Sequence, residues 1–352
     1  MKKTMVSVVS AAVLLAGCTT GGGTPKKELN VYAFGPMIPQ EVMDNFKAET
    51  DIQVNLKEAS SDEEIYEALK KNDASEYDLI IVDEYILEPM IAEDLVAKLD
   101  ADALTNLENV DPVYQGHYFD PNDEYTVPYG AGMQTIIYNT DLVDIDIKGF
   151  DDLLDPSLKD NVGIVDNMLI MMGLSLISNG ELVGTSDLDA VQAAGDKLMK
   201  FAPNVHAIQE AGLDESLISE EIAVGLTYTY EVNNVLEAAK ENGMNFKVVY
   251  PQEGIGYGMM EQAIPKNAKN KEEAHLLIDY MLQPEVAKMC IEMVGFSTNL
   301  ETNKLYTEDE KITRTLPSDF DTSKLQLMTN PTKEAMDLRF KLADSFKNAC
   351  GK

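Results

Sequence analysis

The chain has 352 residues, with 61 acidic against 28 basic side chains and a formal net charge of −33 at pH 7. Such an acidic surface repels the phosphates of nucleic acids and of anionic lipids, which argues against both as binding partners. An acidic field attracts small cations, although an excess of carboxylates also serves solubility alone.

The first residues are typical of an export signal. Lys2 and Lys3 precede an apolar run that is too short to span a bilayer and that ends in LAGC at Cys18. This ending resembles the bacterial lipoprotein box, in which the cysteine thiol receives a diacylglyceryl group. We therefore expect residues 1–17 to be a lipoprotein signal peptide, Cys18 a lipid anchor, and residues 18–28 a flexible tether. The alternative is an incidental cysteine in an ordinary signal peptide.

Strands and helices alternate in the first part of the remaining chain. Patterning predicts strands at 29–34, 52–59 and 77–85, the last running into a polar turn, with helices from Pro39 and at 62–71. This order indicates an α/β lobe with a largely parallel sheet. Because ligands bind beyond the carboxyl ends of such strands, the residues that follow them form a candidate site.

A second series follows and indicates a second α/β lobe. Strands are predicted at 161–166, 221–230 and 246–251, and helices at 171–176, 187–201 and 232–241, before two helices that are separated at Pro284. Extended crossovers near 131–138 and 256–264 would join the lobes. We expect residues 29–135 with 262–308 to form the first lobe and 136–261 with 309–350 the second. Two connecting strands make a hinge, and a hinge between lobes makes a cleft that can close.

Several segments resemble the spermidine/putrescine-binding family of type II periplasmic binding proteins. They occur in the family's order and at its spacing over nearly the whole mature chain, and FDPNDEYTVPY and AIPKNAKNKEEA are the most specific. The resemblance implies a two-lobed, extracytoplasmic, monomeric protein, held at the membrane by its lipid anchor only. Such a protein captures a polyamine or related small cation and delivers it to an ABC permease and its ATPase.

The same resemblance locates candidate ligand-binding residues, several of which depart from the family pattern. Phe34 and Tyr228 stand where the family has tryptophans, and this chain contains no tryptophan. Asn167 and Ile170 stand where the family has Asp and Glu. Gly258 and Met260 stand where the family has Trp and Asp. A polyamine site needs carboxylates for its ammonium groups and aromatic faces for its methylenes.

Other candidate site residues match the family or add acidity. Tyr85 matches its aromatic residue after the third strand, whereas Asp83 replaces a serine. Glu231 matches an aspartate of the putrescine-selective branch, and Gln326 a glutamine that lines the cleft. Tyr257 is a further aromatic candidate. Asp83 and Glu231 would face each other from different lobes. Such a pair suits a diamine or another small cation.

Plainer interpretations stay open at these positions. The tyrosines could be packing residues, Asp83 and Glu231 could be turn residues or helix caps, and Glu261 is interpreted as a solvated hinge residue. Tyr228 and Tyr230 could instead bind ferric iron, and another small solute or an enzyme on this fold are further alternatives. No cofactor or catalytic motif is present, and the histidines share no metal-ligand spacing. A disulfide between Cys290 and Cys350 is permitted outside the cytoplasm but not required.

Overall fold

The protein is described by a computed structural model that covers residues 27–71, 75–292 and 294–351. The predicted signal peptide, Cys18 and most of the tether lie outside the described residues. The tether is shorter than expected, because the first strand already begins at Lys27. In the part of the chain that the structure covers, no helix is long and apolar enough to cross a membrane.

The first strands and helices alternate as predicted. Strand β1 pairs in parallel with β2 and with β3. The predicted polar turn after β3 is wrong, because helix α3 begins directly at Glu84. The elements of this part are β1 (Lys27–Phe34), α1 (Gln40–Thr50), β2 (Ile52–Ala59), α2 (Asp62–Lys71), β3 (Leu79–Asp83), α3 (Glu84–Ala92) and the 3-10 turns η1 (Ala101–Ala103), η2 (Leu107–Asn109) and η3 (Pro112–Tyr114).

A second group of parallel strands follows, with β5 paired to β6 and to β7. The sequence patterns missed β6 and α6, and they placed the start of α7 three residues too late. This part contains β4 (Thr126–Asn139), η4 (Asp151–Leu154), η5 (Pro156–Leu158), β5 (Val162–Val165), α4 (Met168–Ser178), α5 (Leu188–Leu198), η6 (Ala202–Asn204), β6 (Val205–Gln209), α6 (Leu213–Ile218), β7 (Val224–Tyr228), α7 (Thr229–Asn242) and β8 (Phe246–Val249).

The last part of the chain contributes elements to both groups of strands. The predicted pair of helices separated at Pro284 is confirmed, because this proline begins α9, where its missing N–H costs no helical hydrogen bond. The elements are β9 (Ile255–Ala263), α8 (Lys271–Met281), α9 (Pro284–Ile291), α10 (Leu300–Asn303), α11 (Glu308–Arg314), η7 (Thr322–Lys324), β10 (Leu325–Leu327) and α12 (Lys333–Cys350).

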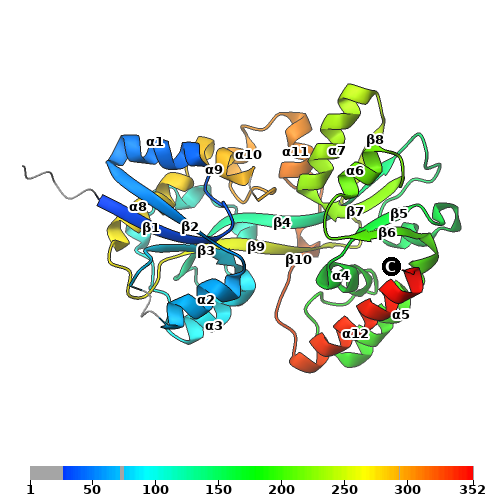
Figure 1. Ribbon diagram of the computed structural model, residues 1–352, viewed down its shortest axis with the longest axis horizontal. Helices are drawn as coiled ribbons and strands as arrows, with labels where there is room; N and C mark the ends of the chain where they lie inside the picture. The colour runs from blue at the N-terminus through cyan, green and yellow to red at the C-terminus, as the bar shows by residue number, and fades with distance from the viewer. Residues whose placement is uncertain (1–26, 72–74, 293, 352) are drawn as a thin grey trace, which may run out of the picture.

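The strands follow the order β2-β1-β3-β9-β4-β7-β5-β6, with β8 beside β4 and β10 beside β9. The predicted crossovers are the long strands β4 and β9, which pair antiparallel with each other and with the neighbours β7 and β3. The sheet is therefore mixed: the strands of each outer group pair in parallel, and the short strand β10 pairs in parallel with β9. Figure 1 shows β4 and β9 running side by side from one group to the other.

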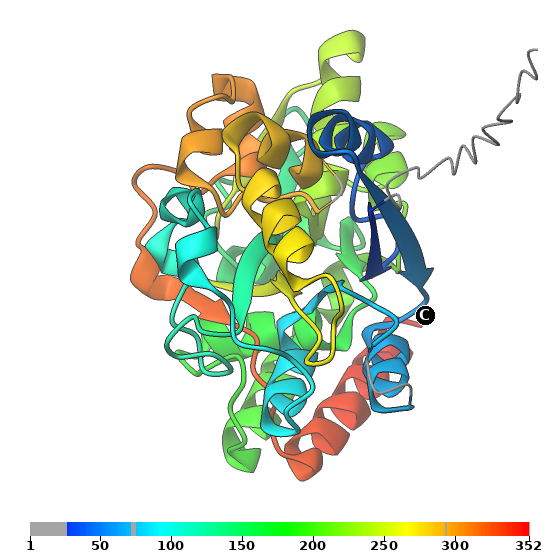
Figure 2. The same cartoon turned by 90° about the vertical axis from the view of Figure 1, so that its left-hand side faces the viewer.

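The buried apolar side chains form separate clusters on the two outer groups. One cluster takes residues from 136–249 together with Ala335 and Phe346 of α12. Two others take residues from 29–129 and 263–306. Helices α1 and α9 cover one face of β1–β3, and α2 and α3 cover the other (Figures 1 and 2). The exact division into 29–135 with 262–308 and 136–261 with 309–350 stays a prediction.

Cys290 and Cys350 belong to different clusters and are not joined in a disulfide. Burial raises the pKa of the Cys290 thiol to about 11, which favours the unreactive protonated form.

Candidate functional site

A cavity of about 660 Å³ lies where β1, β3, β5 and β7 end, beside the connecting strands β4 and β9. It brings together five of the residues that the sequence suggested for ligand binding, from four separate elements. These five lining residues are Phe34, Asp83, Tyr85, Asn167 and Tyr228. Their common position follows from the rule that strands of an open α/β sheet present their carboxyl ends to the ligand.

Two adjacent carboxylates line the cavity at the junction of β3 and α3. The apolar residues of β3 are buried, and the strand ends at Asp83, which precedes the first residue of α3. Glu84 is only 4% exposed, and its Oε2 accepts a hydrogen bond of 2.7 Å from the backbone N–H of Met259. The start of α3 thus fixes both carboxylates next to strand β9.

Burial makes this acidic group harder to ionise. It raises the pKa of Glu84 to about 7 and that of Asp62, which lies beside Asp83, to about 6. The pKa of Asp83 is also raised, first by burial and then by the neighbouring carboxylates of Asp62 and Glu84. Oδ1 of Asp62 is buried and has no hydrogen-bond partner among the described residues. A cation placed here would favour the ionised form of these carboxyl groups, so cation binding is coupled to the loss of their protons.

Aromatic rings stand close to the carboxylates. The hydroxyl of Tyr85 donates to Glu63 at 3.1 Å, and Phe34, at the end of β1, is 43% exposed. The rings of Tyr228 and Tyr230 stack with centroids 5.7 Å apart. Such faces can cover methylene groups and attract an ammonium group through their π electrons.

Asn167 links the start of α4 to the aromatic wall. Its Oδ1 accepts hydrogen bonds from the N–H groups of Leu169 and Ile170, as a helix cap does. Its Nδ2 donates to the hydroxyl of Tyr228 at 3.0 Å. The side chain is therefore fixed in place at the edge of the cavity.

Glu231 lies outside the cavity that the other candidates line. Helix α7 begins at Thr229, so Glu231 is in its first turn and is 2% exposed. Its carboxylate accepts hydrogen bonds from the Gly212 N–H at 2.8 Å and from the Thr227 hydroxyl. The predicted arrangement of Asp83 facing Glu231 across the ligand is therefore not found in this structure.

Tyr257 and Gln326 also lie outside the lining of the cavity. The Tyr257 ring packs edge-on against Tyr114, with centroids 5.9 Å apart, and its hydroxyl is 3.3 Å from Nε2 of His117. The side-chain oxygen of Gln326 accepts from the N–H of Val183 at 2.7 Å. Both side chains contact other protein groups and do not line the cavity.

Sequence reasoning missed or misread several residues. Glu84 and Asn330 line the cavity but were not among the candidate ligand-binding residues, and Tyr230 was considered only as a ligand of ferric iron. Glu261 is not solvated: it is 1% exposed on β9, between β3 and β4, and burial strongly raises its pKa. No local sequence signal reveals this burial, because it depends on the pairing of β9 with both β3 and β4.

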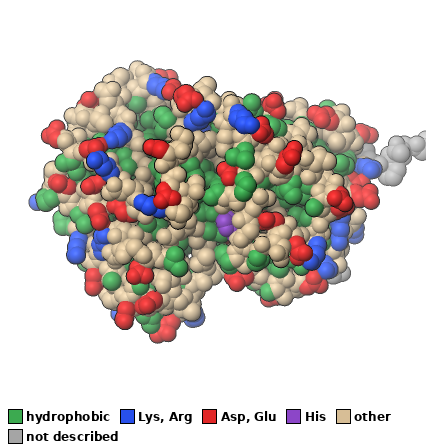
Figure 3. Space-filling view, turned by 180° about the vertical axis from the view of Figure 1, so that it is seen from behind, with side chains coloured by type: hydrophobic (Ala, Val, Ile, Leu, Met, Phe, Trp, Pro, Cys, Tyr) green, Lys and Arg blue, Asp and Glu red, His purple; other side chains and the backbone are tan. Residues whose placement is uncertain are grey.

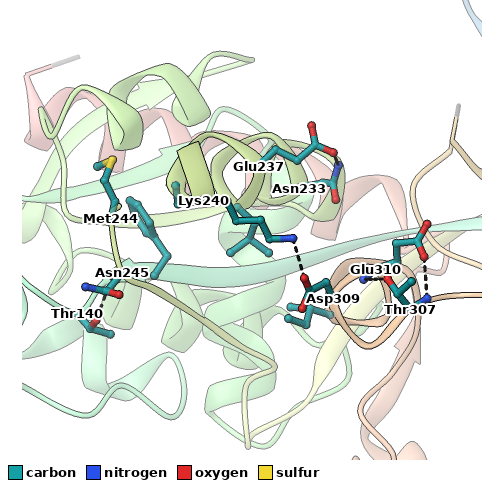
Figure 4. Close-up of a pocket in the computed structure, with 13 residues that line it drawn as sticks. Thr140, Asn233, Glu237, Lys240, Met244, Asn245, Thr307, Asp309 and Glu310 are labelled. Atoms are coloured by element: carbon teal, nitrogen blue, oxygen red, sulfur yellow. Dashed lines mark hydrogen bonds and ion pairs between the residues drawn. The ribbon is translucent and has the colours of Figure 1, made fainter. Parts of the chain in front are cut away.

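A second hollow, of about 500 Å³, lies between α7 and α11 (Figure 4). Its charged groups have partners within the protein: Lys240 pairs with Asp309 at 2.8 Å, and Thr307 and Glu310 form a capping box at the start of α11. On the face of the molecule that Figure 3 shows, acidic and basic side chains are interspersed. This hollow offers no unpartnered charge to a ligand, and the cavity of Asp83 is the better candidate.

Binding of a metal ion in this cavity has less support than binding of an organic cation. Among the described residues, no three His, Cys, Asp or Glu side chains are grouped so that they could hold a metal ion. Burial raises the pKa of both Tyr228 and Tyr230, which opposes the phenolate form that ferric iron needs. The stacked rings are better suited to cover an organic cation.

Known proteins resemble the chain along most of its length. The family model for bacterial extracellular solute-binding proteins matches residues 41–314. The spermidine/putrescine-binding periplasmic protein of Escherichia coli is 32% identical over 326 residues, which cover 92% of each chain. The putrescine-binding periplasmic protein PotF of the same species is 25% identical over 311 residues, 81% of each chain.

Solved structures agree with these relatives. The spermidine/putrescine ABC transporter substrate-binding protein PotD of Streptococcus pneumoniae superposes with a TM-score of 0.82 at 30% identity, over 92% of this chain and 99% of that one. A lipoprotein of Treponema pallidum shares the fold, with a TM-score of 0.76 at 21% identity over 91% of this chain and 99% of that one. The spermidine/putrescine-binding relatives are substrate-binding components of transporters and not enzymes. The chain belongs to the bacterial extracellular solute-binding proteins and, within them, to the spermidine/putrescine-binding family of ABC transporter components.

Proposed function

We propose that the protein captures a polyamine or a related small cation outside the cytoplasm and delivers it to an ABC permease that is driven by its ATPase. The observation that carries the proposal is the pairing of Asp83 and Glu84 with aromatic rings around one cavity. The carboxylates would replace the water around an ammonium group, and the rings would cover the adjoining methylenes. The names of the relatives, which bind spermidine or putrescine, point to the same class of ligand.

The ligand would lie between the two strand groups that β4 and β9 connect. Asp83 and Phe34 belong to one group, and Asn167 and Tyr228 belong to the other. A molecule that contacts both groups favours the arrangement in which they are close together, and a permease can recognise that arrangement. This supports a binding protein that closes on its ligand.

A calorimetric titration of the purified mature protein tests the proposed ligand class. Putrescine, spermidine, alkylamines and quaternary amines are the candidate ligands, with neutral amino acids and ferric ion as the comparison. We expect saturable binding of at least one amine at a single site and none of ferric ion. Binding of ferric ion with visible absorbance, or of no amine at all, would refute the proposal.

We further propose that Cys18 anchors the protein through a lipid. The LAGC segment at the end of the apolar run supports this. In Cys18→Ser, the precursor should stay uncleaved by the lipoprotein peptidase and should not incorporate labelled fatty acid, whereas Cys290→Ser should be labelled like the wild type. Equal labelling of Cys18→Ser and the wild type would remove the anchor from the account.

A further inference from the structure

The acidic side chains of the cavity all lie at one end. Asp83 and Glu84 line it at the start of α3, and Asp62 and Glu63 lie next to Asp83. Among the described residues, no other Asp or Glu lines the cavity, and no Lys or Arg does. A ligand that extends from this end toward β5 and β7 therefore moves from charged to uncharged surroundings.

The carboxylates closest in sequence to the other end are engaged elsewhere. Glu231 accepts hydrogen bonds from Gly212 and Thr227. Asp166, just before Asn167, forms an ion pair of 2.6 Å with Lys347 of α12. Neither of these two residues lines the cavity. A second ammonium group at this end would find no carboxylate to replace its water.

The far end is lined by apolar side chains and by neutral polar ones, among them Gln134 and Thr229 beside Tyr228. Leu169 and Ile170 of α4 and Met336 of α12 present hydrocarbon and thioether groups. The oxygen of Asn167 accepts two N–H groups, and its amide nitrogen donates to Tyr228.

We propose that the ligand is an amine with one cationic head and an uncharged, apolar body. This rests on the proposed function, in which the cavity takes a small organic cation. The head binds at Asp83 and Glu84, between the rings of Tyr85 and Tyr228. The body lies against the hydrocarbon at the start of α4 and against flexible methionines such as Met328 and Met336, which adapt to irregular shapes.

Three ligands of equal chain length separate the possibilities by calorimetry: n-pentylamine, putrescine and γ-aminobutyrate. All three have an ammonium group at one end and six heavy atoms along the chain, and the other end is a methyl group in pentylamine, an ammonium group in putrescine and a carboxylate group in γ-aminobutyrate. We expect pentylamine to bind more tightly than putrescine, by roughly tenfold, because the second ammonium loses water without gaining a charged partner. Equal or tighter binding of putrescine, or tighter binding of γ-aminobutyrate, overturns the proposal.

The same titrations distinguish a failure of the single-head ligand from a failure of the proposed function. If putrescine or spermidine binds and pentylamine does not, the single-head ligand is wrong but the cation-binding protein stands. If none of the three ligands binds and no other amine does, the proposed function itself is wrong.

A gain of charge at the far end provides the second test. Asn167→Asp places a carboxylate there and keeps the cap of α4, because aspartate caps helices as well as asparagine does. The affinity for putrescine relative to pentylamine should rise by about tenfold. Asn122→Asp makes the same charge change at an exposed residue outside the cavity and should leave the ratio unchanged. An unchanged ratio in Asn167→Asp, with normal folding, contradicts the one-ended charge distribution.

Discussion

Oε2 of Glu84 accepts a hydrogen bond of 2.7 Å from the backbone N–H of Met259, which joins the first residue of α3 to the connecting strand β9. A Cβ atom on the neighbouring Gly258 would lie 3.6 Å from the same oxygen, in van der Waals contact with the carboxylate. Asp83 pairs with Met260, which follows Met259 on β9. The acidic end of the cavity is therefore fixed to the strand that links the two groups of the sheet.

Removal of one charge at this end should weaken cation binding. Asp83→Asn keeps the size of the side chain and leaves the ammonium group without one partner, which costs about 2–5 kcal/mol, or at least tenfold in affinity. Calorimetry with the tightest-binding amine measures the effect. Asp309→Asn, which breaks an exposed pair with Lys240 outside the cavity, is the matched control and should bind normally. Wild-type affinity in Asp83→Asn would exclude this carboxylate as a ligand.

Glu231 should contribute to stability and not to binding. Glu231→Ala leaves the Gly212 N–H without its side-chain acceptor and Thr227 without its partner, so the free energy of unfolding should fall by about 1–3 kcal/mol. Denaturant unfolding measures this loss. Glu231→Gln keeps the shape and should bind amines like the wild type. A tenfold loss of affinity in Glu231→Gln at unchanged stability would return Glu231 to the ligand site.

Amine affinity should rise with pH between about 5 and 8. The pKa values of Glu84, at about 7, and of Asp62, at about 6, mean that protons occupy part of the acidic group at pH 5. A cation must displace these protons at pH 5 but meets ionised carboxylates at pH 8. Calorimetry in buffers of different ionisation enthalpy should detect proton release near pH 6. Affinity that is constant from pH 5 to 8, with no proton release, would contradict the buried acidic group.

Glu84 also makes the stability of the ligand-free protein depend on pH. The folded pKa of Glu84 lies above the ordinary value of 4.5, so the folded state holds its proton more tightly than the unfolded state. This contribution is present below pH 4.5 and is lost as the pH rises to about 7. Glu84→Gln should remove this part of the pH dependence of the melting temperature.

Ligand binding should draw the two groups of the sheet together around β4 and β9. Small-angle scattering with a saturating amine should give a smaller radius of gyration than without it. Asp83→Asn at the same amine concentration should keep the larger value. An unchanged radius with an amine that is proven to bind would mean that the groups do not move.

The candidate residues that the structure brings to the cavity lie at or just after strand ends. Phe34 and Asp83 follow recognisable apolar strands, and the carboxyl ends of such strands meet. Glu231 was misplaced because α7 begins at Thr229, which turns its side chain toward Gly212. The burial of Glu261 depends on the pairing of β9 with both β3 and β4, and pairing between distant segments is not visible in a local pattern.

A crystal structure of the protein with a bound amine tests the central claim most directly. The account predicts the ammonium nitrogen within hydrogen-bonding distance of a carboxylate oxygen of Asp83 or Glu84, with its methylenes against Tyr85 or Tyr228. An amine bound in the hollow between α7 and α11, or in the cavity with its ammonium group away from both carboxylates, would contradict it.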